Sequence, residues 1–183
     1  MTTVPTTGPT HPQAGVPAPP TAALPTRRLD VVADVYVVGA HGGAGESTVA
    51  ALNPAWWAET GHGWPLVPTS AAPRVLLVAR TSASGLRAAQ AAATQWAAGA
   101  TPPIDLLGLV LVADAPGRLP RPLRELAQLV GGGVPRTWTL PWSEPWRLGE
   151  EVTPRGRRRP AAVLLRDVHL LLSQTTDERN PLK

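Results

Sequence analysis

Four short apolar runs divide the chain between residues 34 and 140. They read DVYVVG at 34–39, RVLLVAR at 74–80, LLGLVLVA at 106–113 and RTWTL at 136–140. Runs that are apolar on both faces are typical of buried parallel strands, because helices cover both faces of a parallel sheet. We therefore predict a mostly parallel sheet of about four strands.

Segments with helical character lie between these runs. Residues 84–98 are rich in alanine and are followed by Gly99, a common helix stop. Residues 120–130 carry four apolar side chains on one face, ahead of three glycines: Leu123, Leu126, Leu129 and Val130. Further helices are expected at 47–52 and 161–173. Alternating strands and helices predict a three-layer α/β domain.

The two ends differ from this middle part. Residues 1–28 are mainly Pro, Thr, Ala and Gly, so ordering them would cost more entropy than burial returns. We predict a disordered tail at 1–28, the α/β domain at 29–174 and a C-terminal tail at 175–183. The first residues lack the features of a signal peptide, and no apolar run reaches the ~18 residues of a membrane helix. We expect a cytoplasmic protein with no membrane partner.

Charge and composition exclude some classes of site. The chain has no cysteine, and its four histidines are widely separated, so we expect neither a disulfide framework nor a metal site. The net charge is +4, and a cluster of arginines lies in PRGRRRP: Arg155, Arg157, Arg158 and Arg159. A solvated loop is the simpler interpretation of this cluster. Contact with nucleic acid or an acidic protein surface is the alternative.

A glycine-rich loop, GAHGGAGEST, follows the first predicted strand and opens a predicted helix. Glycines let the backbone approach a phosphate, and free N–H groups at a helix start attract anions. The pattern G-x-x-x-x-G-K-[ST] is matched at Gly45 and Ser47, whereas Ala40 replaces its first glycine and Glu46 its lysine. Reversing a unit charge about 4 Å from a phosphate costs about 8 kcal/mol at an effective dielectric of about 20. The loop residues considered are Gly39, His41, Gly42, Gly43, Gly45, Glu46, Ser47 and Thr48.

The loop resembles the deviant Walker A loop of ParA/MinD-type ATPases, K-G-G-x-G-K-[ST]. His41 and Glu46 stand at its two lysine positions. The resemblance extends in order and style over residues 35–149, and the chain is also similar to a bacterial family of unassigned function that carries this loop. It implies a P-loop fold with an ATP site.

Two departures from that family argue against hydrolysis. The family has an aspartate that organises magnesium after a later strand, whereas RVLLVAR ends at Arg80 and Thr81. The adenine-reading asparagine is also missing, with Asp114 near its place. We therefore predict a non-catalytic, P-loop-like binding or regulatory protein that has no cofactor. Its partner would be an unidentified protein or a second copy of the chain.

Two alternatives stay open. Gly39, Gly42 and Gly45 also fit G-x-x-G-x-x-G, which resembles the dinucleotide loop of atypical short-chain reductases. Arg80 would then meet the 2′-phosphate of NADP, although the chain has no Tyr-x-x-x-Lys pair. The other alternative is a weak ATPase. If the loop lacks only its cation, Glu46→Lys should create affinity for a nucleoside triphosphate without hydrolysis.

Further candidate ligand contacts follow later strands. They are Arg80, Asp114, Arg118 and Trp142, and carboxyl ends of strands are where open α/β sheets place ligands. Tryptophans recur every four residues at 138, 142 and 146, but Pro141 and Pro145 argue against a helix there. We predict an extended segment that covers the sheet edge, with stacking against a base or partner as the alternative.

Overall fold

Five parallel strands form the central sheet of the computed structural model, which describes residues 4–21, 23–150 and 160–179. Only the backbone is described for 175–179. The strand order is β3-β2-β5-β6-β7, and every neighbouring pair is parallel. The bounds are β2 Val35–Gly39, β3 Trp57–Glu59, β5 Arg74–Arg80, β6 Asp105–Val112 and β7 Thr137–Leu140. The three-layer α/β prediction is confirmed.

The sheet has one strand more than predicted. β3 adds three residues at the edge beside β2, too few to form a recognisable apolar run. Two further three-residue strands, β1 (Thr26–Arg28) and β4 (Trp64–Leu66), form a separate parallel pair. The four apolar runs correspond to β2, β5, β6 and β7.

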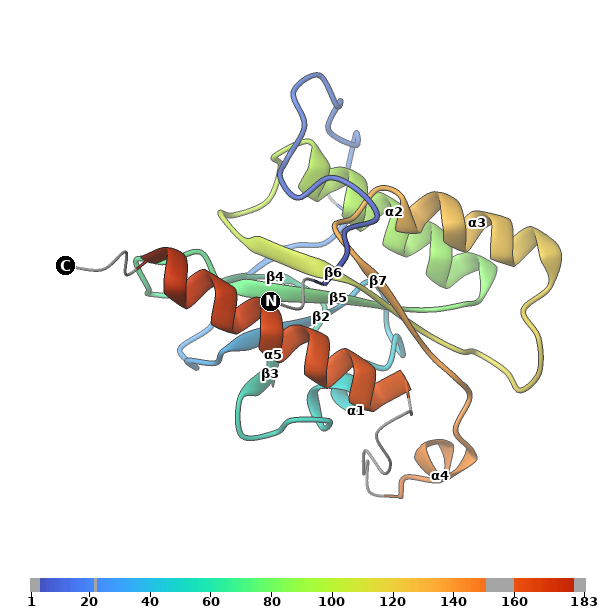
Figure 1. Cartoon of the computed structure of the whole chain (residues 1–183). Helices are drawn as coiled ribbons and strands as arrows, with labels where there is room; N and C mark the ends of the chain where they lie inside the picture. The colour runs from blue at the N-terminus through green and yellow to red at the C-terminus, as the bar shows by residue number, and fades with distance from the viewer. Residues whose placement is uncertain (1–3, 22, 151–159, 180–183) are drawn as a thin grey trace.

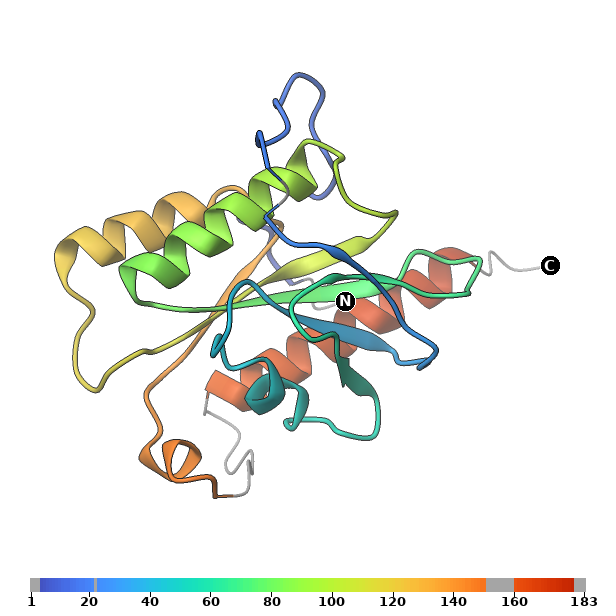
Figure 2. The same cartoon turned by 180° about the vertical axis from the view of Figure 1, so that it is seen from behind.

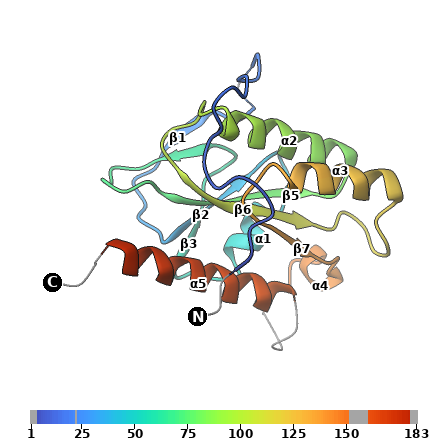
Figure 3. The ribbon, with the colours of Figure 1, turned by 45° about the horizontal axis from the view of Figure 1, so that its top comes forward.

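Helices cover both faces of the sheet, as Figures 1 and 3 show. On one face, α2 (Ala83–Ala97) and α3 (Arg121–Gly131) pack over a cluster that includes Leu77, Leu109 and Trp96. On the other face, α1 (Glu46–Ala50) and α5 (Pro160–Arg179) enclose a second cluster with Leu76 and Leu164. The strands are therefore buried on both sides, which is why they read as continuous apolar runs.

The tryptophan segment is extended at Trp138, as predicted, but it contains a helical turn at Trp146. Trp138 lies in β7 and is buried, and its Nε1 donates to Asp167 Oδ2 at 3.1 Å. Trp146 lies in α4 (Glu144–Arg147), a single helical turn that the sequence did not predict. Pro145 is compatible with it because proline in the first turn removes no helical hydrogen bond.

The N-terminal segment crosses the domain at a few points of contact. Its described residues contain no helix or strand before Thr26. Even so, the predicted tail has buried residues at Val4 and Leu24 and includes β1. It loops over the end of α2 (Figure 2), where Gln13 N donates to Ala97 O at 2.7 Å.

Gln95 of α2 makes the firmest of these contacts, because its buried side-chain amide pairs with both the backbone N–H and the backbone C=O of Leu24. It accepts from Leu24 N at 3.0 Å and donates to Leu24 O and Ala100 O, both at 3.1 Å. The segment before β1 is therefore attached to α2 by a side chain that water cannot replace without exposing the core.

Gln95→Ala is expected to lower the free energy of unfolding by about 2 kcal/mol, because buried backbone groups lose their partners. Limited proteolysis should then cut near Leu24 faster than in the natural protein. Gln90→Ala is the matched control, since Gln90 lies exposed on the same helix. Equal effects of the two substitutions on stability and cleavage would contradict this attachment.

The C-terminal helix runs past the predicted domain end at residue 174, because α5 continues to Arg179. Arg155, Arg157, Arg158 and Arg159 lie outside the described residues. No helix in the described part of the chain combines the length and apolar character needed to cross a lipid bilayer.

Candidate functional site

The carboxyl edge of the sheet carries the candidate site. In chain order the strands of the main sheet are arranged 2-1-3-4-5, so the order reverses between β2 and β5. Doubly wound sheets bind ligands outside the carboxyl ends at such a switch point. The glycine loop leaves β2 there, and Arg80 ends β5 beside it.

The loop has the open backbone expected of a phosphate loop. Gly43 and Gly45 adopt φ values of 76° and 95°, in the left-handed region that favours glycine. A side chain at Gly42 or Gly43 would meet nothing within 4 Å, so this part of the loop faces open space. Access to the backbone is therefore preserved, and the direction of the Glu46 side chain decides what the loop can do.

Glu46 is turned away from that open space and buried. Its Oε1 accepts from Thr60 N and Gly61 N, each at 2.8 Å, and from Thr60 Oγ1 at 3.2 Å. Only 4% of the residue is exposed. The carboxylate therefore ties the start of α1 to the turn between β3 and β4.

His62 completes this contact. Its Nδ1 lies 2.7 Å from Glu46 Oε2, the distance of an ion pair, although the geometry is not that of a directed hydrogen bond. We call Glu46, Thr60, Gly61 and His62 the Glu46 latch. His62 is the one non-glycine residue with positive φ in the described chain, at 62°. A Cβ at Gly39 would lie 2.6 Å from His62 Nδ1 and 2.8 Å from Glu46 Oε2, so glycine gives the latch its space.

His41 and Arg80 connect the glycine loop to the end of β5 at the switch point. Arg80 N donates to His41 Nε2 at 3.2 Å, and His41 Nδ1 lies 2.9 Å from Gly42 O. Nε2 therefore accepts from a backbone N–H, and Nδ1 faces a backbone carbonyl oxygen. The Arg80 guanidinium donates from Nε to Gly43 O and from Nη1 to Ala113 O, both at 3.1 Å. The loop's nearest cation therefore comes from β5.

Two adjoining cavities open along the carboxyl edge. One, of about 100 Å³, is lined by Thr48, Arg80, Trp142, Ser143, Trp146 and Arg147, together with backbone around Ala113. The other, of about 670 Å³, is lined by Asp114, Arg118, Leu123 and Trp142 among others. All four predicted ligand contacts line one or both cavities, and Trp142 lines both.

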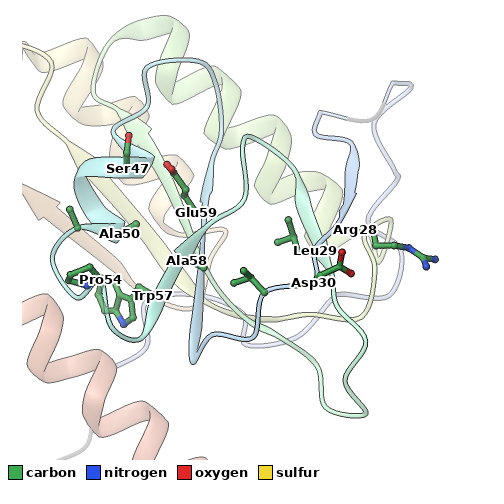
Figure 4. A pocket seen from close by; sticks show the side chains of 11 residues that line it. Arg28, Leu29, Asp30, Ser47, Ala50, Pro54, Trp57, Ala58 and Glu59 are labelled. Carbon is green, nitrogen blue, oxygen red and sulfur yellow. The ribbon is translucent and has the colours of Figure 1, made fainter.

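The serine of the loop motif faces elsewhere. Ser47 lines a cavity of about 570 Å³ at the β3 edge, where Figure 4 shows it near Glu59 at one end. Arg28 and Asp30 lie at the other end of this cavity. Ser47 and Arg80 therefore line different cavities, although the motif places serine with the phosphate-binding cation.

Several residues of the site escaped prediction. Thr60, Gly61 and His62 lie in a turn without a recognised motif, and their role depends on how Glu46 points. Arg147 and Trp146 reach the small cavity only because α4 forms. The one local signal was Glu46 at the lysine position of the loop pattern, because a buried carboxylate needs hydrogen-bond donors from another part of the chain.

Other ionisable groups lie apart from this edge. Burial lowers the pKa of Arg136, just before β7 at the opposite end of the sheet, and Asp105 and Asp167 partly offset that effect. Within the described residues, no three side chains of His, Cys, Asp or Glu come together as metal ligands.

Comparisons with known proteins place the chain by its sequence. No curated protein and no solved structure matches it. One family model matches residues 33–163, which span the sheet, the glycine loop and both cavities of the carboxyl edge. The chain therefore belongs to the family of unknown function DUF6668.

Proposed function

We propose that the chain is a non-catalytic binding or regulatory protein whose glycine loop has become a structural support. One observation carries this proposal. Glu46 occupies the lysine position of the ParA/MinD-like pattern. Its carboxylate is buried and is already bound by Thr60, Gly61 and His62. A phosphate loop needs a cation at this sequence position for the outer phosphates of a nucleotide, and this chain has a buried carboxylate there instead.

The next strand supports the same conclusion. Where a hydrolysing relative would carry a carboxylate for magnesium, β5 ends in Arg80, and Thr81 follows it. Thr81 Oγ1 accepts from Asp114 N at 3.0 Å, which uses the hydroxyl to join the ends of β5 and β6. Asp114 itself lies exposed after β6. Arg80 and the engaged Thr81 hydroxyl therefore support a function that needs no magnesium chemistry.

The carboxyl edge remains suited to binding. The larger cavity there has about 670 Å³, within the range of about 300–1,000 Å³ typical of small-molecule sites. Its walls combine apolar side chains with Arg118 and Asp114. A ligand or a segment of a partner protein would be recognised here, and its binding would need no chemical step.

The natural protein is expected to release no phosphate from Mg-ATP or Mg-GTP above the buffer rate, because binding alone does not lower a barrier. Equilibrium titrations with ATP, GTP and NADPH accompany this assay. Steady phosphate release would overturn the proposal. Micromolar binding of Mg-ATP at the glycine loop, seen as binding that Arg147→Gln does not weaken, would overturn it as well. Micromolar binding of NADPH would favour the reductase-like alternative.

Glu46→Lys sharpens the test. The sequence alone predicts new triphosphate affinity, but the structure changes that expectation, since a lysine here would face the N–H donors of Thr60 and Gly61. We expect a less stable protein that still does not bind ATP. ATP binding by this variant would show that the side chain at 46 is free to turn toward the loop.

A further inference from the structure

The small cavity beside the loop is compact and is lined by two arginines. At about 100 Å³ it is below the ~300 Å³ of typical drug-sized sites and has room for a group of a few heavy atoms. Arg80 and Arg147 are its charged lining residues, and no carboxylate lines it among the residues that the structure describes. Neither arginine forms an ion pair within the described residues.

Arg80 is held in place before any ligand arrives. Two of its guanidinium nitrogens are bound to the carbonyls of Gly43 and Ala113, and Nη2 has no acceptor among the described residues. A guanidinium fixed in this way loses less rotational freedom on binding than a free one. Its remaining N–H groups are available for an oxyanion.

The other walls extend this donor set. Thr48 and Ser143 bring hydroxyl groups, which donate to oxyanions, and Trp142 and Trp146 complete the lining. None of the loop glycines lines the cavity. This place is therefore separate from the backbone cradle that a phosphate loop uses.

We propose that this cavity binds a compact oxyanion, inorganic phosphate or the phosphate group of a small molecule, between Arg80 and Arg147. The inference rests on the proposed non-catalytic binding function and names the chemistry of its ligand. The larger cavity on the other side of Trp142 gives the rest of such a molecule room.

Isothermal titration of the full chain with inorganic phosphate, at constant ionic strength and with chloride as the reference anion, tests the proposal. We expect saturable binding to one site, and weakening of about tenfold or more in Arg147→Gln, because a charge-assisted contact is lost. The Arg147 side chain is exposed and makes no hydrogen bond within the described residues, so this change should leave the fold intact. Arg80→Gln should weaken binding similarly. Arg118→Gln, in the neighbouring cavity, should leave it unchanged.

Adenosine monophosphate in place of phosphate distinguishes the two sources. Tighter binding than that of phosphate, still lost in Arg147→Gln, assigns the site to a phosphate group on a larger molecule. Absence of binding by either probe overturns the proposal. So does binding that survives in both Arg80→Gln and Arg147→Gln, or that is lost only when the arginines at 155–159 are replaced. Phosphate release from ATP is measured separately. The proposed non-catalytic function can therefore fail while the phosphate site is upheld, and the phosphate site can fail while the non-catalytic function is upheld.

Discussion

Glu46→Ala is expected to lower the free energy of unfolding by about 3 kcal/mol. The change removes the acceptor for two backbone N–H groups and the Thr60 hydroxyl, and it removes the anion beside His62. We count the ion pair for little because the His62 side chain is 44% exposed to solvent. Urea unfolding followed by tryptophan fluorescence measures the loss.

Two further variants separate the parts of this effect. Glu46→Gln keeps a carbonyl oxygen for the Thr60 and Gly61 donors but cannot pair with a charged histidine, so its loss should be smaller. Glu59→Ala removes an exposed carboxylate in β3 and should change stability by less than about 0.5 kcal/mol. A Glu46→Ala protein as stable as the Glu59→Ala protein would refute the Glu46 latch as a stabilising contact.

Gly85→Ala is expected to cost about 2 kcal/mol, although alanine normally stabilises a helix by about 1 kcal/mol relative to glycine. Gly85 is buried in the first turn of α2, and its N–H donates to Ser82 Oγ at 3.2 Å. A Cβ there would collide with the Arg80 carbonyl and lie 2.9 Å from His41 Nε2. The backbone carbonyl cannot rotate away as a flexible side chain would.

Gly42→Ala supplies the control in the same region. Gly42 has no positive φ, and its Cβ would meet nothing within 4 Å, so this change should alter stability by less than about 0.5 kcal/mol. Thermal unfolding compares the two variants. A Gly85→Ala protein at least as stable as the natural one would show that α2 can shift without disturbing Arg80.

The layers of the fold could be predicted because burial on both faces leaves a direct trace in the sequence. The runs of β2, β5 and β6 are apolar at most positions, and such runs are typical of a covered parallel sheet, whereas β7 at the edge alternates threonine with Trp138 and Leu140. β3 could not be found in this way, since three residues give no periodicity and the strand forms by pairing with β2. Leu129 shows the limit of helical periodicity, because it was grouped with Leu123, Leu126 and Val130 on one apolar face of α3 but is 66% exposed.

The candidate site was only partly predictable, for a different reason. The glycines, Arg80 and Trp142 carry local signals, either a motif or a position at a strand end. The partners of Glu46 lie 14 and 15 residues away along the chain, in a turn whose path depends on how β3 and β4 pack. The direction of the Glu46 side chain therefore decides how the whole loop is interpreted, and the loop sequence alone does not give that direction.

The attachment of Leu24 to Gln95 has a consequence for synthesis of the chain. The two residues are 71 positions apart, so at about 5–20 residues per second the ribosome makes Leu24 about 4 to 14 seconds before Gln95. Helices and hairpins form in microseconds, so folding itself adds little to that delay. During this interval Leu24 and its neighbours have no α2 to bind. On the newly made chain they are therefore accessible to chaperones and proteases.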